Sequence, residues 1–376
     1  MQPKAARNIP IEALRLVAVA GIAVFHTFQW TFQAACVGAV EYAPLAMSPY
    51  SGVLGFINLL GCWANEVFFM ISGYFLIASA ARAWDGGATW KSQMQRTAQR
   101  LGKVILPTAF YCLMALAWST VVSPIPDVTL NTHYWYTLGL EFIWVYAATV
   151  FMAPWVGLAK SRLPQKTYTT TVIAVGVLAF VVNGYLAAMS AASGGEFSWL
   201  QKFMSAATYV IAFLNGGLLR DVTDAMDSAR AGTFGMRSLV TVLALAAILE
   251  GALSFTGNLT AMAVLSYKST SLISFALAAV SLLFAATRRS ASGNPRTAGV
   301  IVTLSTATLG FYVMQSLTSS LWRPVFNTLL ANILVSQNSP AAICIVTGTV
   351  ISIVFALVLL IIDAARSLIA RKLKRQ

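Results

Sequence analysis

Two residues near the N-terminus, Arg15 and His26, have side chains suited to chemistry and stand within an apolar stretch of sequence. They are eleven residues apart, which at 100° per residue is about 20° past three full helical turns, so both face the same side of a helix. Their separation along the axis is about 16 Å. A cation attracts an anionic ligand, and an imidazole exchanges protons near neutral pH. The pair predicts a polar track along one helix.

A charged side chain inside a bilayer is costly, and it marks either a functional site or a paired structural contact. Glu12 lies one turn before Arg15 and can pair with it. In the structural interpretation, Arg15 extends to the membrane interface and His26 hydrogen-bonds to a neighbouring helix. In the functional interpretation, both residues line the polar track. The residues alone leave both interpretations open.

Two further segments combine polar and small residues in ways that matter for a site. Glu66 is a carboxylate in an apolar stretch that needs a partner, and it precedes the small residue Ser72, which allows close helix approach. Arg96, Arg100 and Lys103 recur at spacings of four and three, so they share one face of a helix. This basic face is typical either of ordinary membrane-topology charge or of a clamp for phosphates.

A third segment begins with aromatic residues and continues with an acid. His133 and Trp135 fit an aromatic belt at a membrane interface. Glu141 follows among apolar residues and is harder to explain by packing. Gln315 is a weaker polar candidate near the C-terminal end.

The composition indicates which elements must position these residues. The chain has 58% hydrophobic and 10% charged residues, and its mean hydropathy is +0.74. Soluble domains carry roughly 25% charged residues, so the bilayer is the solvent, and the ~10-residue alternating segments of a membrane barrel do not occur. We predict an all-α, polytopic membrane protein of about ten transmembrane helices. The expected spans are residues 11–30, 54–80, 104–122, 133–155, 168–188, 199–219, 237–255, 262–286, 298–320 and 342–363.

The cations support this topology. We predict that both termini are cytoplasmic, because 21 of the 25 Lys and Arg residues then fall in cytoplasmic segments, as the positive-inside rule requires. The net charge of +13 is then a topology signal beside anionic lipid rather than a nucleic-acid interface. The four cysteines lack metal-ligand spacing, so we expect no metal site. We expect an uncleaved first helix and one membrane domain over residues 1–376, without a fused soluble domain.

The ordered set of segments resembles the acyltransferase family 3 membrane proteins. The matching features are an acid–Arg–His pattern in residues 12–26, an acid followed by FF and SG in 66–73, a basic stretch in 96–103, an aromatic segment at 133–136 and LGFYVMQ at 309–315. The last segment often ends in His in that family, and this chain has Gln there. This departure weakens any role for a second histidine and leaves the first-helix pair untouched.

The resemblance implies transfer of an acyl group, most often acetyl from acetyl-CoA, to a hydroxyl of a polysaccharide or lipid-linked sugar at the plasma or inner membrane. Acyl-CoA is then a substrate, and no cofactor is bound permanently. His26 would act as general base or carry the acyl group transiently. The implied catalytic residues are His26, Arg15 and Glu66; the implied donor-binding residues are Arg15, Arg96, Arg100 and Lys103. The implied supporting residues are Glu12, Ser72, His133, Trp135, Glu141 and Gln315.

Some family members carry an extracytoplasmic hydrolase-like domain, so a separate extracytoplasmic transferase is a further expected partner. The principal alternative is a transporter that exports a glycan or a small anion. A transporter predicts an inverted repeat, and the sequence of residues 1–188 has no convincing similarity to that of residues 189–376. A receptor or scaffold explains neither Arg15 nor His26.

Overall fold

The regular elements of the protein are helices throughout the part of the chain that the computed structural model describes, which is residues 7–192, 198–266, 271–288, 294–336 and 339–373. The long helices are α1 (Ile9–Cys36), α3 (Tyr50–Asp85), α4 (Trp90–Val121), α5 (Glu141–Arg162), α6 (Gln165–Ala192), α7 (Ser198–Ala225), α8 (Ser228–Phe255) and α14 (Pro340–Leu373). The shorter ones are α2 (Ala43–Ala46), α9 (Leu259–Leu265), α10 (Leu272–Thr287), α11 (Pro295–Ser305), α12 (Thr308–Leu317) and α13 (Ser319–Ser336). Two 3₁₀ turns, η1 (Val40–Tyr42) and η2 (Trp135–Thr137), complete the set.

Seven helices of the described chain are long and apolar enough to cross a membrane, or eight if α11 and α12 are one bent span. The prediction of an all-α polytopic membrane protein is therefore confirmed. The count of about ten included residues 199–219 and 262–286. The first range forms α7, which has 28 residues and is not among the seven, and α10 has only 16 residues.

Three departures from the sequence-based expectation bear on the site. Residues 133–140 form turns and η2, and α5 begins only at Glu141, because Tyr134 and Gly139 have left-handed φ angles of 72° and 61°. The range 298–320 contains α11 and α12, which are bent by 42° relative to each other. Residues 321–341 were expected to be a loop, and most of them belong to α13.

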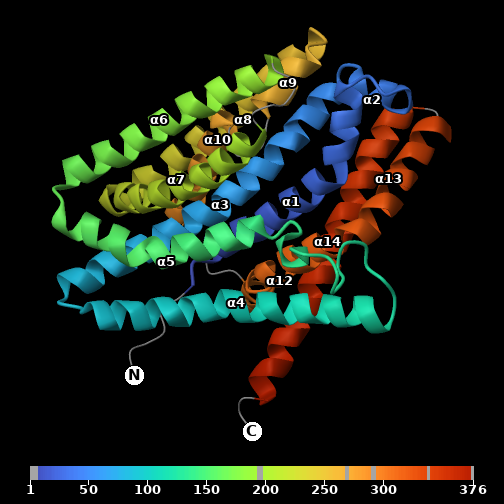
Figure 1. Cartoon of the computed structure of the whole chain (residues 1–376). Helices are drawn as coiled ribbons and strands as arrows, with labels where there is room; N and C mark the ends of the chain where they lie inside the picture. The colour runs from blue at the N-terminus through green and yellow to red at the C-terminus, as the bar shows by residue number, and fades with distance from the viewer. Residues whose placement is uncertain (1–6, 193–197, 267–270, 289–293, 337–338, 374–376) are drawn as a thin grey trace.

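The central element is α3, which contacts α1, α5, α7, α8 and α10. In Figure 1 it runs diagonally through the bundle beside α1. Small residues allow the closest of these approaches: a Cβ added to Gly73 would clash with the backbone carbonyl of Phe213 in α7, and one added to Gly216 would clash with the carbonyl of Met70. The small residues of the segment around Ser72 therefore do bring two helices together.

A buried polar cluster joins α4 and α14 beside α12. Asp363 of α14 is only 1% exposed. Its carboxylate accepts hydrogen bonds from the Tyr111 hydroxyl of α4 at 2.7 Å and from Arg366 Nε at 2.7 Å. A side chain at Gly310 of α12 would collide with this carboxylate. The cluster thus joins α4 to α14, and α12 packs closely against it at Gly310. Figure 1 shows α12 next to α4 and α14.

Candidate active site

One face of α1 lines two separate cavities. Arg15, Val19 and Ile22 line the first, which we call cavity A. His26 and Gln29 line the second, which we call cavity B. The successive spacings of four, three, four and three residues place these side chains on one continuous stripe of the helix. Arg15 and His26 therefore share a face, as their spacing predicts, and α1 connects the two cavities.

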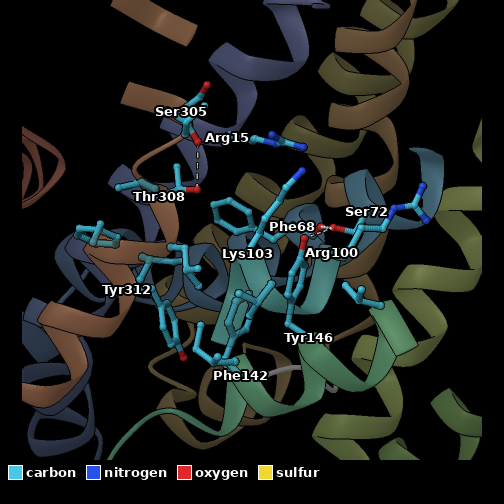
Figure 2. A pocket seen from close by; sticks show the side chains of 18 of the residues that line it. Arg15, Phe68, Ser72, Arg100, Lys103, Phe142, Tyr146, Ser305, Thr308 and Tyr312 are labelled. Atoms are coloured by element: carbon cyan, nitrogen blue, oxygen red, sulfur yellow. Dashed lines mark hydrogen bonds between the residues drawn. The ribbon is translucent and has the colours of Figure 1, made fainter. Parts of the chain in front are cut away.

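Cavity A has a volume of about 360 Å³ and lies among α1, α3, α4, α5, α11 and α12. Its defining residues are Arg15, Ser72, Arg100, Lys103, Phe142 and Tyr312. Three of them, Arg15, Arg100 and Lys103, are cations contributed by two helices. Figure 2 shows Arg15 and Lys103 on one side of this cavity and the rings of Phe142 and Tyr312 on the other. One part of the cavity can hold an anion while another holds an apolar chain.

The three cations differ in how many hydrogen bonds and ion pairs they make with other residues of the protein. Arg15 Nη1 donates to Glu12 Oε2 at 3.2 Å, and Arg7 Nη1 lies 3.8 Å from the other oxygen of that carboxylate. Arg100 Nη2 donates to Ser79 Oγ at 3.3 Å. Lys103 is exposed, and its ammonium makes no hydrogen bond or ion pair within the described chain. Lys103 is thus the cation most available to a ligand.

The wall of cavity A opposite the cations is mainly aromatic. Phe68 and Tyr146 lie beside Phe142 there, with ring centroids 6.3 Å and 6.4 Å from the Phe142 centroid. Ser72 Oγ is 2.9 Å from the Phe68 carbonyl oxygen and 3.0 Å from the Tyr146 hydroxyl, so it is held by two partners. This wall suits an uncharged, slender part of a ligand.

Cavity B is larger, about 520 Å³, and its lining is more polar in character. Its defining residues are His26, Gln29, Asn65, Phe142, Glu141, Tyr209, Tyr312, Ser316 and Arg323. They come from α1, α3, α5, α7, α12 and α13. Hydroxyl and amide side chains can both donate and accept hydrogen bonds. This cavity therefore suits a ligand that carries several hydroxyl groups.

His26 is placed against a cation in cavity B. Arg323 Nη2 lies 3.4 Å from His26 Nδ1. A guanidinium only donates hydrogen bonds, so we assign Nδ1 as the acceptor, and the neutral imidazole then carries its proton on Nε2. The side chain of Gln29 also contacts the imidazole. The lone pair of His26 is thus directed at a cavity wall that already contains a hydrogen-bond donor.

Several residues selected from the sequence lie in these two cavities. Arg15, Ser72, Arg100 and Lys103 line cavity A. His26 and Glu141 line cavity B. Glu12 lines neither cavity and supports Arg15 instead.

Other selected residues lie outside both cavities. The side chains of Arg96 and His133 are exposed, and Trp135 is half-buried in η2. Glu66 is completely buried in α3, and neither carboxylate oxygen has a hydrogen-bond partner in the described structure. Gln315 is 2% exposed and is not among the residues that line either cavity. Their positions give these five residues no direct contact with a ligand in cavity A or B.

Among the cavity residues that the sequence did not single out, three are central to the site. Arg323 was expected in a loop, and the structure places it on α13 beside His26. Phe142 directly follows Glu141, and Tyr312 lies in the LGFYVMQ segment. A signal for Arg323 was present, because it is a lone cation beside the apolar residues Leu321 and Trp322.

The comparison with protein families identifies the family of the chain. A family model described as an acyltransferase domain, acyltransferase family 3, matches residues 8–360. The match begins before α1 and ends within α14, so it covers both cavities. Neither the comparison with curated proteins nor that with solved structures found a match. The chain therefore belongs to acyltransferase family 3, a family of membrane acyltransferases.

Proposed function

We propose that this protein transfers an acyl group, typically acetyl, from acyl-CoA in cavity A to a hydroxyl of a glycan or lipid-linked sugar in cavity B. The observation that carries the proposal is the stripe on α1, which leads from Arg15 in cavity A to His26 in cavity B. The positive-inside charge pattern favours a cytoplasmic location for the Arg15 end of α1. Acyl-CoA is made in the cytoplasm, and the proposed membrane is the plasma or inner membrane.

Cavity A has the features that an acyl-CoA requires. Coenzyme A carries phosphate groups, and guanidinium and ammonium groups bind phosphates through charge-assisted hydrogen bonds. Arg15, Arg100 and Lys103 supply such groups at one side of the cavity. The aromatic wall at the other side suits the uncharged pantetheine arm and its thioester. This arrangement supports a donor that is anionic at one end and uncharged at the reactive end.

The proposed reaction uses His26 as general base. The imidazole takes the proton from the acceptor hydroxyl, and the hydroxyl oxygen attacks the thioester carbonyl carbon. The new C–O bond forms, the C–S bond breaks, and the departing thiolate of coenzyme A receives the proton from the imidazolium. The products are the acyl ester and free coenzyme A. A transient acyl-His26 intermediate is the alternative course of the same net transfer.

Arg323 supports this reaction as a positioning residue. Its guanidinium lies beside the nitrogen of His26 to which we assign the lone pair. When an acceptor hydroxyl binds to His26 Nδ1, the Arg323 guanidinium lies next to the reacting groups. It can then donate to the thioester carbonyl oxygen, which becomes negatively charged as the hydroxyl attacks. A preorganised donor at such a position stabilises the transition state. Glu141 in the same cavity is a hydrogen-bond acceptor for sugar hydroxyls.

Replacement of the two histidines tests the proposal, because the chain has only two. We expect purified His26→Ala to bind radiolabelled acetyl-CoA but to lose coenzyme A release and acetylation of cell-envelope glycan. His133→Ala is the matched control, because His133 is exposed and lines neither cavity. Retained activity in His26→Ala contradicts the proposed mechanism. Glycan uptake into vesicles without any acyl transfer would support a transporter instead.

A further inference from the structure

We propose that Phe142 and Tyr312, which we call the ring pair, determine which acyl groups can pass from cavity A to cavity B. This inference rests on the proposed function, and it adds a determinant of acyl-chain size. Phe142 and Tyr312 are the two residues that line both cavities. Neither side chain carries a charge, so the selection they exert is by size.

The geometry of the ring pair closes the direct route between the cavities. The ring centroids of Phe142 and Tyr312 are 4.6 Å apart, and the ring planes are tilted by 33°. At this separation the two rings are in van der Waals contact, and no alkyl chain fits between them. Figure 2 shows both rings on the side of cavity A that lies opposite Arg15 and Lys103. The thioester can meet the acceptor only when the rings separate.

One member of the pair is braced by other aromatic residues. The ring of Phe142 packs against Phe69, with centroids 5.0 Å apart, and against Tyr209 at 5.9 Å. Phe69 is completely buried and stacks on Tyr209 at 4.7 Å with an interplanar angle of 5°. These contacts hold Phe142 against the central helix α3. The Phe142 side of the passage is therefore the fixed side.

The other member lies on a helix that is set apart from its neighbours in the chain. Tyr312 belongs to α12, which has only ten residues and is bent by 42° from α11. The helix α13 starts two residues after the end of α12. A short segment between two breaks can shift without distorting a long helix. We therefore assign the movement that opens the passage to Tyr312 and α12.

The ring pair makes acyl size a determinant of rate. A two-carbon acetyl group requires a smaller separation of the rings than a four-carbon butyryl group does. Each methylene that an apolar site rejects changes kcat/KM by roughly 10-fold or more. Wild-type protein should therefore process acetyl-CoA faster than propionyl-CoA and propionyl-CoA faster than butyryl-CoA.

The test compares coenzyme A release from acetyl-CoA, propionyl-CoA and butyryl-CoA, with water as the acceptor, in purified full-length protein. Phe142→Leu and Tyr312→Leu shorten one member of the pair, and we expect the butyryl-to-acetyl ratio of kcat/KM to rise about 10-fold. Phe151→Leu is the matched control, because Phe151 is on the same helix as Phe142, is exposed and lines neither cavity. Its ratio should stay within about twofold of the wild-type ratio. A larger ring in Tyr312→Trp should lower the propionyl-to-acetyl ratio, which keeps the test valid if a leucine variant fails to fold.

The outcomes separate the two proposals. The inference is overturned if no ring-pair variant changes the acyl preference. The proposed function still stands in that case, provided that the wild-type protein releases coenzyme A in a reaction that depends on His26. An equal change of preference in Phe151→Leu also overturns it, because the effect would then not depend on the residues between the two cavities. No release from any acyl-CoA by the wild-type protein, either with water or with cell-envelope glycan as the acceptor, removes the proposed function and the inference together.

Discussion

The role of the basic face of α4 can be tested through one pair of substitutions. Lys103 and Arg96 are on the same helix, and family resemblance suggests that both bind the donor. The structure separates them, because Lys103 lines cavity A, whereas Arg96 is exposed and lines neither cavity. Lys103→Gln and Arg96→Gln each remove one positive charge, an ammonium and a guanidinium respectively, at different positions on α4. Lys91→Gln provides a third variant, exposed and near the start of α4.

The size of the effect follows from the contacts. The Lys103 ammonium makes no hydrogen bond or ion pair in the described structure, so a phosphate can use its full charge. A hydrogen bond to a charged group contributes about 1.5–3 kcal/mol. Since 1.4 kcal/mol is a factor of ten, KM for acetyl-CoA should rise roughly 10- to 100-fold in Lys103→Gln. The charge of Arg96 acts through screened solvent, and its loss should change KM by less than about twofold.

The assay is the initial rate of coenzyme A release as a function of acetyl-CoA concentration. The loss of a group that binds the donor equally in the ground and transition states raises KM and leaves kcat unchanged. We therefore expect the kcat of Lys103→Gln to match that of Lys91→Gln. An equal rise of KM in Arg96→Gln and Lys103→Gln would refute the assignment of the donor to cavity A. An unchanged KM in Lys103→Gln would refute it as well.

Three other predictions concern the second cavity and the framework. Arg323→Gln should lower kcat by roughly 10²-fold at unchanged KM for acetyl-CoA in steady-state assays, because it removes a hydrogen-bond donor to the transition state. Arg323→Lys should restore part of kcat. A change in KM alone would contradict this role. Gly73→Ala should destabilise the protein by about 1–3 kcal/mol, because the added Cβ meets the Phe213 carbonyl, and thermal unfolding in detergent measures the loss. Arg366→Gln should cost about 3 kcal/mol, because Asp363 loses its ion-pair partner while it stays buried, and a melting temperature equal to that of wild type would contradict this.

The sequence predicts the parts of the site that depend on one helix at a time. The common face of Arg15 and His26 follows from helical periodicity alone, and the structure shows it. Periodicity also places Arg100 and Lys103 on one side of α4, and both line cavity A. It cannot show that Arg96 misses the cavity, because that depends on where α4 crosses α12 and α5.

The parts that depend on long-range packing were not predictable from local pattern. Arg323 and Pro324 interrupt the apolar run after residue 320, so residues 321–341 resembled a loop, and the structure has α13 there. The bend between α11 and α12 falls at Thr306 and Ala307, where neither proline nor glycine signals a break. The ring pair joins residues 170 positions apart in the chain, and only the packed structure brings them into contact.

The central claim is that His26 performs the chemical step on a donor held elsewhere. Rapid-quench single-turnover measurements with saturating radiolabelled acetyl-CoA test it most directly, because they separate the chemical step from donor binding. We expect His26→Ala to bind acetyl-CoA with unchanged affinity. Its chemical step should slow by roughly 10²- to 10⁴-fold, the usual contribution of a general base. A chemical step in His26→Ala as fast as that of the wild-type protein would contradict the role of His26 as general base.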